Sequence, residues 1–225
     1  MNTHKWIPVF AINLKSRTDR FLNIKSEFRR YNFFKLEVVK AIEDANGGYG
    51  LWKTIYAIIA EADRRGDDYV LICEDDHIFT SHFNIKDLMN NIAKGKLLGI
   101  DVLLGGVSWS RGILRSTDNL YWIDNFNGTQ FMIIYRVFFK KFLEMPIRKD
   151  LTVDMAISNA TNHIMVIYPF ISIQREFGYS DATDQNNEIG YVDALFNATM
   201  NKFDQLHKVF KVLRSRIHSE DEAVL

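Results

Sequence analysis

Three consecutive acidic residues, Glu74, Asp75 and Asp76, are the group in this sequence whose types and spacing best suit chemistry. They follow directly on the apolar run at residues 69–73, which predicts a buried strand. Neighbouring carboxylates repel one another unless a cation or hydrogen-bond donors compensate their charge, and carboxylate oxygens suit Mg²⁺ and Mn²⁺. The triplet therefore indicates a metal site that can hold a diphosphate, with a solvated acidic turn as the alternative.

The elements around the triplet predict an α/β fold. Apolar runs at 7–14, 33–41, 69–73 and 102–104 predict strands, and helical spacing at 18–31, 51–65 and 85–93 places helices between them. Strands that alternate with helices favour a mainly parallel central sheet flanked by helices on both faces. Ligands of such sheets bind outside the carboxyl ends of the strands, which is where the triplet is predicted to lie.

The second half of the chain has a less regular pattern. Strands are predicted at 120–123, 130–135 and 165–173, helices near 137–144 and 154–159, and a polar, turn-rich loop at 181–190. We expect this half to build the acceptor side of the site. The whole is predicted to be a single domain at residues 1–200, followed by a C-terminal amphipathic helix and tail at residues 201–225.

Composition and charge exclude some classes of protein. Lysine plus arginine and aspartate plus glutamate number 28 each, so no global field attracts nucleic acid, and an anion site must be built locally. The single cysteine, Cys73, lies in an apolar run, where a thiol packs as a small hydrophobe. No run approaches the roughly 18 apolar residues of a membrane span, and none resembles a signal peptide. The expectation is a cytoplasmic protein, with peripheral attachment at the inner face of a membrane as a further option.

The C-terminal helix carries a stripe of apolar residues three and four apart, at positions 203, 206, 210, 213 and 217, with lysines and arginines on its other faces. Three interpretations are open. The stripe packs onto the domain, pairs with a second copy through residues 201–217, or lies on an anionic membrane where a lipid-linked glycan acceptor would be found.

Several segments resemble, in the expected order, glycosyltransferase family 25, the lipopolysaccharide and procollagen galactosyltransferase group. The resemblance spans residues 7–183. Two departures, the absence of a proline before Asp154 and of a Ser-His pair after Gly50, predict a separate subfamily with a different acceptor. The segments are Ile12-Asn13-Leu14 with Arg17, Asp19 and Arg20; Val39-Lys40-Ala41-Ile42; Val70-Leu71-Ile72-Cys73-Glu74-Asp75-Asp76; Gly128-Thr129-Gln130-Phe131-Met132-Ile133-Ile134; Val153-Asp154; and Ile173 to Asp181.

The resemblance implies a nucleotide-sugar-binding fold of the GT-A type and a metal-dependent, inverting transfer of a hexose such as galactose. The donor would be a UDP-sugar held with Mn²⁺ or Mg²⁺, and the acceptor a cell-surface glycan. Asp76 would bind the metal. Guanidinium groups pair well with phosphate oxygens, although arginines in a first helical turn can equally be surface charges. The resemblance assigns donor binding to Asn13, Arg17, Arg20, Lys40, Ala41, Glu74 and Asp75.

An inverting transfer needs a general base beside the acceptor hydroxyl. Asp154 is the candidate, because it begins a predicted helix whose positive end would keep it ionised; capping of that helix is the equal alternative. Asp181, before the polar loop, is predicted to complete the metal site or to clamp the donor, since closure of a loop would exclude water.

Two other classes of function use similar residues. A nucleotidyltransferase or phosphohydrolase would also place carboxylates and a metal at strand ends, but the turn Lys15-Ser16-Arg17-Thr18 has none of the glycines common after the first strand of a nucleotidyltransferase. A non-catalytic sugar-nucleotide-binding domain would be free to lose its acidic ligands, whereas this chain has all three. Both considerations favour the transferase.

Overall fold

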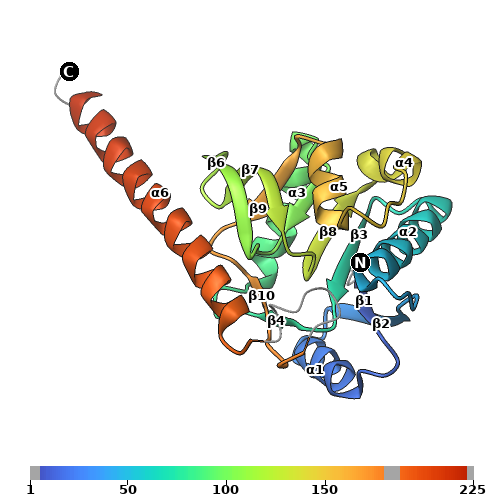
Figure 1. Ribbon diagram of the computed structural model, residues 1–225. Helices are drawn as coiled ribbons and strands as arrows, with labels where there is room; N and C mark the ends of the chain where they lie inside the picture. The colour runs from blue at the N-terminus through green and yellow to red at the C-terminus, as the bar shows by residue number, and fades with distance from the viewer. Residues whose placement is uncertain (1–5, 180–187, 222–225) are drawn as a thin grey trace.

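The computed structural model describes residues 6–179 and 188–221, and within them a central eight-stranded sheet organises the molecule (Figure 1). The strand order is β2-β1-β3-β8-β5-β9-β7-β6. The pairs β2–β1, β1–β3 and β5–β9 are parallel, whereas β8 and β7 run against their neighbours. Most strands therefore point the same way, as predicted. The strands are β1 Ile7–Asn13, β2 Phe34–Lys40, β3 Tyr69–Glu74, β5 Val102–Leu104, β6 Trp109–Arg115, β7 Leu120–Asn127, β8 Phe131–Tyr135 and β9 Ile164–Ile167.

Helices cover both faces of the sheet, because successive apolar residues of its inner strands point to opposite sides. Val70 and Ile72 of β3 join the core under α2, α4, α5 and the start of α6, whereas Leu71 and Cys73 join the core under α1 and α3. All four side chains are fully buried. This confirms the predicted α/β class and the buried thiol. The helices are α1 Thr18–Arg29, α2 Gly47–Arg65, α3 Ile85–Leu98, α4 Arg136–Glu144, α5 Val153–Ala160 and α6 Tyr191–Asp221.

Two parts of the second half differ from the prediction. The single strand predicted at 165–173 is wrong: β9 ends at Ile167, Pro169 follows, and the chain re-enters strand as β10 (Ser172–Gln174). Proline offers no N–H to a sheet, so it interrupts the strand. β10 pairs antiparallel with β4 (His77–Phe79), a short strand directly after the acidic triplet that the polar sequence concealed. The edge strand β6 also lacked a clear apolar signal, since much of it is exposed.

The helix α6 is continuous from Tyr191 to Asp221, so the domain boundary predicted at residue 200 falls inside it. Its first half belongs to the core: Phe196 and Phe203 are buried, and Thr199 Oγ1 donates to the Ser108 carbonyl (2.7 Å). Its second half extends away from the rest of the molecule (Figure 1). Among the described residues, no helix combines the length and the apolar character needed to cross a membrane.

Candidate active site

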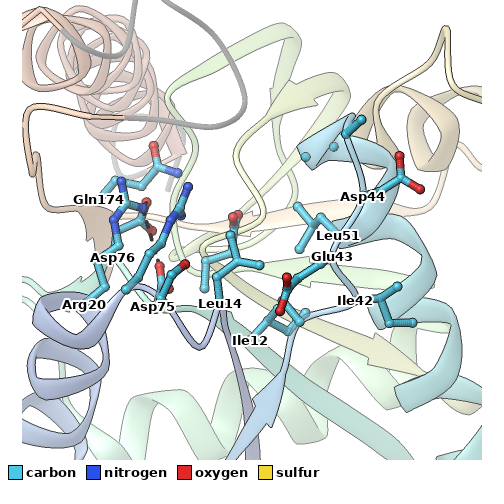
Figure 2. Close-up of a pocket in the computed structure, with 17 residues that line it drawn as sticks. Ile12, Leu14, Arg20, Ile42, Glu43, Asp44, Leu51, Asp75, Asp76 and Gln174 are labelled. Atoms are coloured by element: carbon cyan, nitrogen blue, oxygen red, sulfur yellow. Dashed lines mark hydrogen bonds and ion pairs between the residues drawn. The ribbon is translucent and has the colours of Figure 1, made fainter.

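A pocket of about 480 Å³ opens at the carboxyl ends of β1, β2 and β3 (Figure 2). Parallel strands end there together, so residues distant in sequence meet at one edge of the sheet. One side holds the acidic triplet with two arginines, and the other mixes apolar residues with the carboxylates of Glu43 and Asp44 (Figure 2). The lining residues are Ile12, Leu14, Ser16, Arg17, Arg20, Ala41, Ile42, Glu43, Asp44, Ala45, Gly47, Gly48, Leu51, Glu74, Asp75, Asp76 and Gln174.

The three carboxylates of the triplet have different partners. Asp75 accepts hydrogen bonds from Asn13 Nδ2 (2.8 Å) and Arg20 Nη1 (3.4 Å). Glu74 Oε1 accepts from the Thr129 hydroxyl at 2.6 Å. Asp76 Oδ2 pairs with Arg20 Nη1 at 3.1 Å, but Asp76 Oδ1 is buried without a hydrogen-bond partner. The triplet thus keeps one buried carboxylate oxygen unsatisfied at the pocket, which is unusual for so polar an atom.

Burial governs the protonation of these acids. Loss of solvent raises the pKa of Asp76 well above the ordinary range, and the neighbouring Glu74 charge adds to this effect, while Arg20 opposes it. The pKa of Asp75 and that of Glu74 are also raised, again first by burial. For Arg20, burial by itself lowers the pKa, but the charges of Asp76 and Asp75 outweigh it and the pKa is raised. The pocket is a place where a further cation would be stabilised.

Arg20 is held from several sides. Its Nη2 donates to the Tyr179 carbonyl (2.5 Å), and its guanidinium carbon lies 4.7 Å and 4.9 Å from the ring centres of Tyr179 and Phe177. Arg17 lies over the same Tyr179 ring at 5.5 Å. The Nε of Arg20 is buried and has no hydrogen-bond partner. A donor without a partner therefore lies in the same cluster as the unsatisfied acceptor on Asp76.

His77, directly after the triplet, is a buried residue that connects the strand following the triplet to β10. His77 is fully buried, its Nδ1 lies 2.8 Å from Ser172 Oγ, and its ring packs on Phe79 and Phe131. Burial lowers the pKa of His77 to about 3, so the ring is neutral near neutral pH. It thus serves as a structural link between β4 and β10.

The opposite wall comes from the loop after β2 and the start of α2. The Ile42 N–H donates to Thr54 Oγ1 (2.8 Å), and the same hydroxyl donates to the Gly50 carbonyl (2.8 Å). A Cβ on Gly50 would lie 2.4 Å from the Ile42 carbonyl oxygen, so only glycine allows this approach. Asn46 caps α2 by accepting from Tyr49 N (3.0 Å). The helix predicted to begin at residue 51 therefore begins one turn earlier, at Gly47.

These wall residues were largely missed from sequence. Ile42, Asp44, Gly47, Gly48, Leu51 and Gln174 line the pocket but carry no catalytic motif. The available signal was the Asn46-Gly47-Gly48 sequence, since asparagine is a preferred helix cap and would have moved the helix start ahead of residue 51.

The donor-binding residues expected from sequence do not all reach the pocket. Arg17, Arg20, Ala41, Glu74 and Asp75 line it, as does the expected metal ligand, Asp76. Asn13 lies behind them and holds both Asp75 and the Arg17 carbonyl. The Lys40 side chain is exposed and pairs with Glu43 at 3.6 Å instead of lining the pocket.

The expected base, Asp154, is buried in the first turn of α5 and is not a lining residue. Its carboxylate accepts from Thr152 Oγ1, from Met155 N (2.9 Å) and from Gly128 N (3.4 Å), whereas the N-cap residue of α5 is Thr152. It is nevertheless close enough that its charge raises the pKa of Glu74. Asp181 lies outside the described residues.

The residues present fit a divalent cation that is held only in part by protein. Within residues 6–179 and 188–221, no three His, Cys, Asp or Glu side chains are grouped so as to bind a metal ion by themselves. Mg²⁺ typically binds through one or two carboxylates and completes its shell with water and substrate phosphates. The unsatisfied Asp76 Oδ1 provides one such carboxylate oxygen.

Comparison with known proteins finds no matching family model and no matching curated protein. A glycosyltransferase involved in the glycosylation of the major capsid of PBCV-1 aligns with 61% of this chain and 63% of its own, at 9% identity and a TM-score of 0.39. Apo UDP-glucose pyrophosphorylase aligns with 86% of this chain and 80% of its own, at 15% identity and a TM-score of 0.42. The same enzyme complexed with UDP-glucose aligns with 87% and 81%, at 14% identity and a TM-score of 0.45. Similarities of this size carry no argument about activity, so the function rests on the residues of the site.

Proposed function

We propose that this protein is a metal-dependent glycosyltransferase that moves a hexose from a UDP-sugar to a glycan acceptor. One observation carries the proposal: a buried acceptor on Asp76 and a buried donor on Arg20 lack partners in one ion-paired cluster beside the 480 Å³ pocket. A buried polar atom without a partner costs about 1–3 kcal/mol. A bound diphosphate with its cation would satisfy both atoms, because phosphate oxygens accept from guanidinium and the cation binds carboxylate.

The two walls of the pocket suit the two ends of such a donor. The carboxylate of Asp76 would hold the cation, and the guanidinium groups of Arg17 and Arg20 would take phosphate oxygens. When bound, the metal would neutralise charge on the departing diphosphate. Leu14, Ala41 and Leu51 offer apolar surface for a nucleoside on the opposite side.

The assignment of Asp154 as the base for inversion remains part of the proposal. Its support is that the Gly128 N–H donates to Asp154 (3.4 Å) while the hydroxyl of the next residue, Thr129, donates to Glu74 (2.6 Å). To act as a base it must exchange one of its three hydrogen bonds for the acceptor hydroxyl. The resemblance to family 25 favours galactose as the sugar and a cell-surface or lipid-linked glycan as the acceptor.

The proposal is tested by measuring thermal stabilisation and turnover with UDP-, GDP- and CMP-sugars, with and without Mn²⁺ or Mg²⁺. We expect a UDP-sugar to raise the melting temperature only with metal, and Asp76→Asn to abolish this shift. The matched control is Asp124→Asn, which removes an aspartate that is also paired with an arginine, Arg111, at 2.8 Å on the distant β6–β7 hairpin. Stabilisation that is equal in Asp76→Asn and wild type would refute the metal site.

The products separate the competing functions. A glycosyltransferase releases UDP and glycosylates an acceptor, a nucleotidyltransferase consumes or forms pyrophosphate, and a phosphohydrolase releases phosphate or a monophosphate without any acceptor. Phosphorus NMR of the reaction mixture distinguishes these outcomes. Donor binding without any turnover across an acceptor panel that includes lipid-linked glycans would instead indicate a non-catalytic sugar-nucleotide-binding domain.

A further inference from the structure

Two arginines occupy the start of α1, where basic residues are least favourable. Arg17 is the N-cap residue of α1, and Arg20 follows three positions later. The N-terminus of a helix carries partial positive charge, which destabilises cations there, and like charges three positions apart repel each other. Groups outside the helix must therefore hold the two guanidinium groups at the pocket, which both of them line.

Two aromatic residues that follow β10 pack against these arginines. The Phe177 ring is shared by two of them, because its centre lies 5.4 Å from the guanidinium carbon of Arg175 and 4.9 Å from that of Arg20. The Tyr179 ring is shared in the same way by Arg20, at 4.7 Å, and Arg17, at 5.5 Å. An arginine over an aromatic face is attracted to the ring, most strongly where water is excluded. One ring, that of Tyr179, thus contacts both arginines of the pocket.

The segment that carries these rings is attached to the rest of the molecule at three points. The Arg175 N–H donates to the Asp76 carbonyl (2.8 Å), and the Tyr179 hydroxyl donates to both carboxylate oxygens of Asp19 (2.8 and 2.9 Å). Between them, the Glu176 carboxylate accepts from two backbone N–H groups in the first turn of α6, at 2.7 and 3.0 Å. The rings are therefore fixed independently of any ligand.

We propose that Tyr179 is a positioning residue for the diphosphate, whose ring holds Arg17 and Arg20 in the orientation that takes phosphate oxygens. This inference rests on the proposed function. Tyr179 does not itself line the pocket, so it acts through the two arginines. An arginine that is already held in place loses less conformational freedom when a phosphate binds. The ring therefore raises affinity at the phosphate end of a ligand and leaves the nucleoside end unaffected.

The experiment is calorimetric titration of the full chain with UDP in the presence of Mg²⁺, with inorganic pyrophosphate measured by competition against UDP. Tyr179→Leu removes the ring but keeps the carbonyl that accepts from Arg20, and we expect it to bind both ligands about tenfold more weakly than wild type. Tyr179→Phe keeps the ring and loses only the hydroxyl, so its affinity should stay within about threefold of wild type.

The matched control is Tyr31→Leu. It removes a ring that also contacts an arginine, Arg30 at 5.8 Å, but at the other end of α1. We expect this variant to bind UDP as wild type does, and thermal melts check that each variant is folded.

A double variant separates positioning from a general structural role. Because Tyr179 acts through the arginines, Tyr179→Leu and Arg17→Gln in one chain should weaken UDP binding by less than the product of their separate factors.

The outcomes distinguish this proposal from the proposed function. Equal UDP binding in Tyr179→Leu and wild type, a loss for UDP without one for pyrophosphate, or the full product in the double variant overturns the role of Tyr179 alone. A wild type that binds neither ligand with Mg²⁺ overturns both.

Discussion

At the scale of single residues, the three adjacent acids have two different roles. Asp75 is tied to Asn13 and Arg20, and Glu74 to Thr129, so both are part of the frame of the site. Asp76 alone keeps an unsatisfied oxygen, and burial raises its pKa furthest from the ordinary range. An acid held in this way is costly for the folded protein and useful only if a ligand compensates it.

This cost predicts a gain in stability on mutation of Asp76. Because the folded-state pKa of Asp76 is raised above its unfolded value, its contribution to stability is present below the unfolded pKa and is lost as pH rises through the folded pKa. We expect Asp76→Asn in metal-free protein to unfold at higher urea concentration than wild type near neutral pH, with the difference shrinking toward acid pH. Donor-dependent turnover should be lost in the same variant. Urea titrations with a chelator across the pH range measure this, and a variant less stable than wild type at neutral pH would contradict it.

The two roles considered for Asp154, general base and helix cap, can be distinguished by the substitution Asp154→Asn. Asp154→Asn keeps an oxygen for Met155 N but cannot act as a base. In either role, the hydrogen bonds lost in Asp154→Asn should cost about 1 kcal/mol of stability. If Asp154 is the base, turnover of the folded protein should in addition fall by about 10²–10⁴-fold with donor binding retained; if it is only structural, that turnover should stay intact. Single-turnover rates and thermal melts on the same samples decide between the two roles.

At the scale of elements, the nucleoside wall depends on how the β2–α2 loop is folded back. The Thr54 hydroxyl joins Ile42 to Gly50, and the bare Cα of Gly50 lets the two backbones touch. In sequence this is the place where the chain departs from the signature of family 25, because Thr54 stands where that signature has serine and no histidine follows it. In the structure, Thr54 holds the β2–α2 loop, which lines the pocket, in place.

The loop should therefore affect donor binding through its shape. Thr54→Val keeps the volume but leaves the Ile42 N–H without its acceptor, at a cost of about 1–3 kcal/mol. We expect this variant to bind the UDP-sugar more weakly than wild type. Thr199→Val is the control, because it removes a buried hydroxyl of α6 that donates to the Ser108 carbonyl and does not line the pocket. Calorimetric titration with donor should show weaker binding for Thr54→Val only; equal affinities would show that the loop does not shape the site.

At the scale of the whole molecule, α6 belongs to two environments. Its first half closes one face of the sheet, where Phe203 packs against the rings of Tyr121, Tyr168 and Phe170. In its second half, His207 Nδ1 lies 2.9 Å from Tyr121 OH and the Phe210 ring lies 5.3 Å from the Arg115 guanidinium, after which the helix projects from the body (Figure 1). The helix is thus a structural part of the domain at one end and a projection from it at the other.

The two halves should differ sharply in their effect on stability. Phe203→Ala removes a fully buried ring and should lower the free energy of unfolding by about 3–5 kcal/mol. Leu213→Ala, at 51% exposure, should change it by less than about 0.5 kcal/mol in dilute, monomeric protein. Chemical unfolding of both variants at low protein concentration checks the contrast. Similar losses for the two would mean that the projecting half is part of the monomer's core.

Local sequence patterns were sufficient for most of the sheet and for the acidic triplet. The run at 69–73 is apolar on both faces of its strand and ends abruptly in charges, so its burial and the position of Asp76 follow from neighbouring residues alone. The same patterns failed where long-range contacts decide the structure. β4 is only three residues long, His77-Ile78-Phe79, and forms a strand because β10, nearly a hundred residues later, pairs with it.

What the sequence determined by itself is the order of most strands and helices, but not β4, β6 or the division of β9 from β10. It also determined the presence of carboxylates and arginines near strand ends, because these depend on periodicity and on short-range burial. Only the tertiary structure decided which of them act together. The pairing of Arg20 with Asp76 joins positions 56 residues apart, and Tyr179, 159 residues from Arg20, closes on it. The tertiary structure also decided that the Lys40 side chain pairs with Glu43 instead of lining the pocket, and that one oxygen of Asp76 has no hydrogen-bond partner. Such contacts depend on side-chain direction across separate elements, which no local pattern of residues encodes.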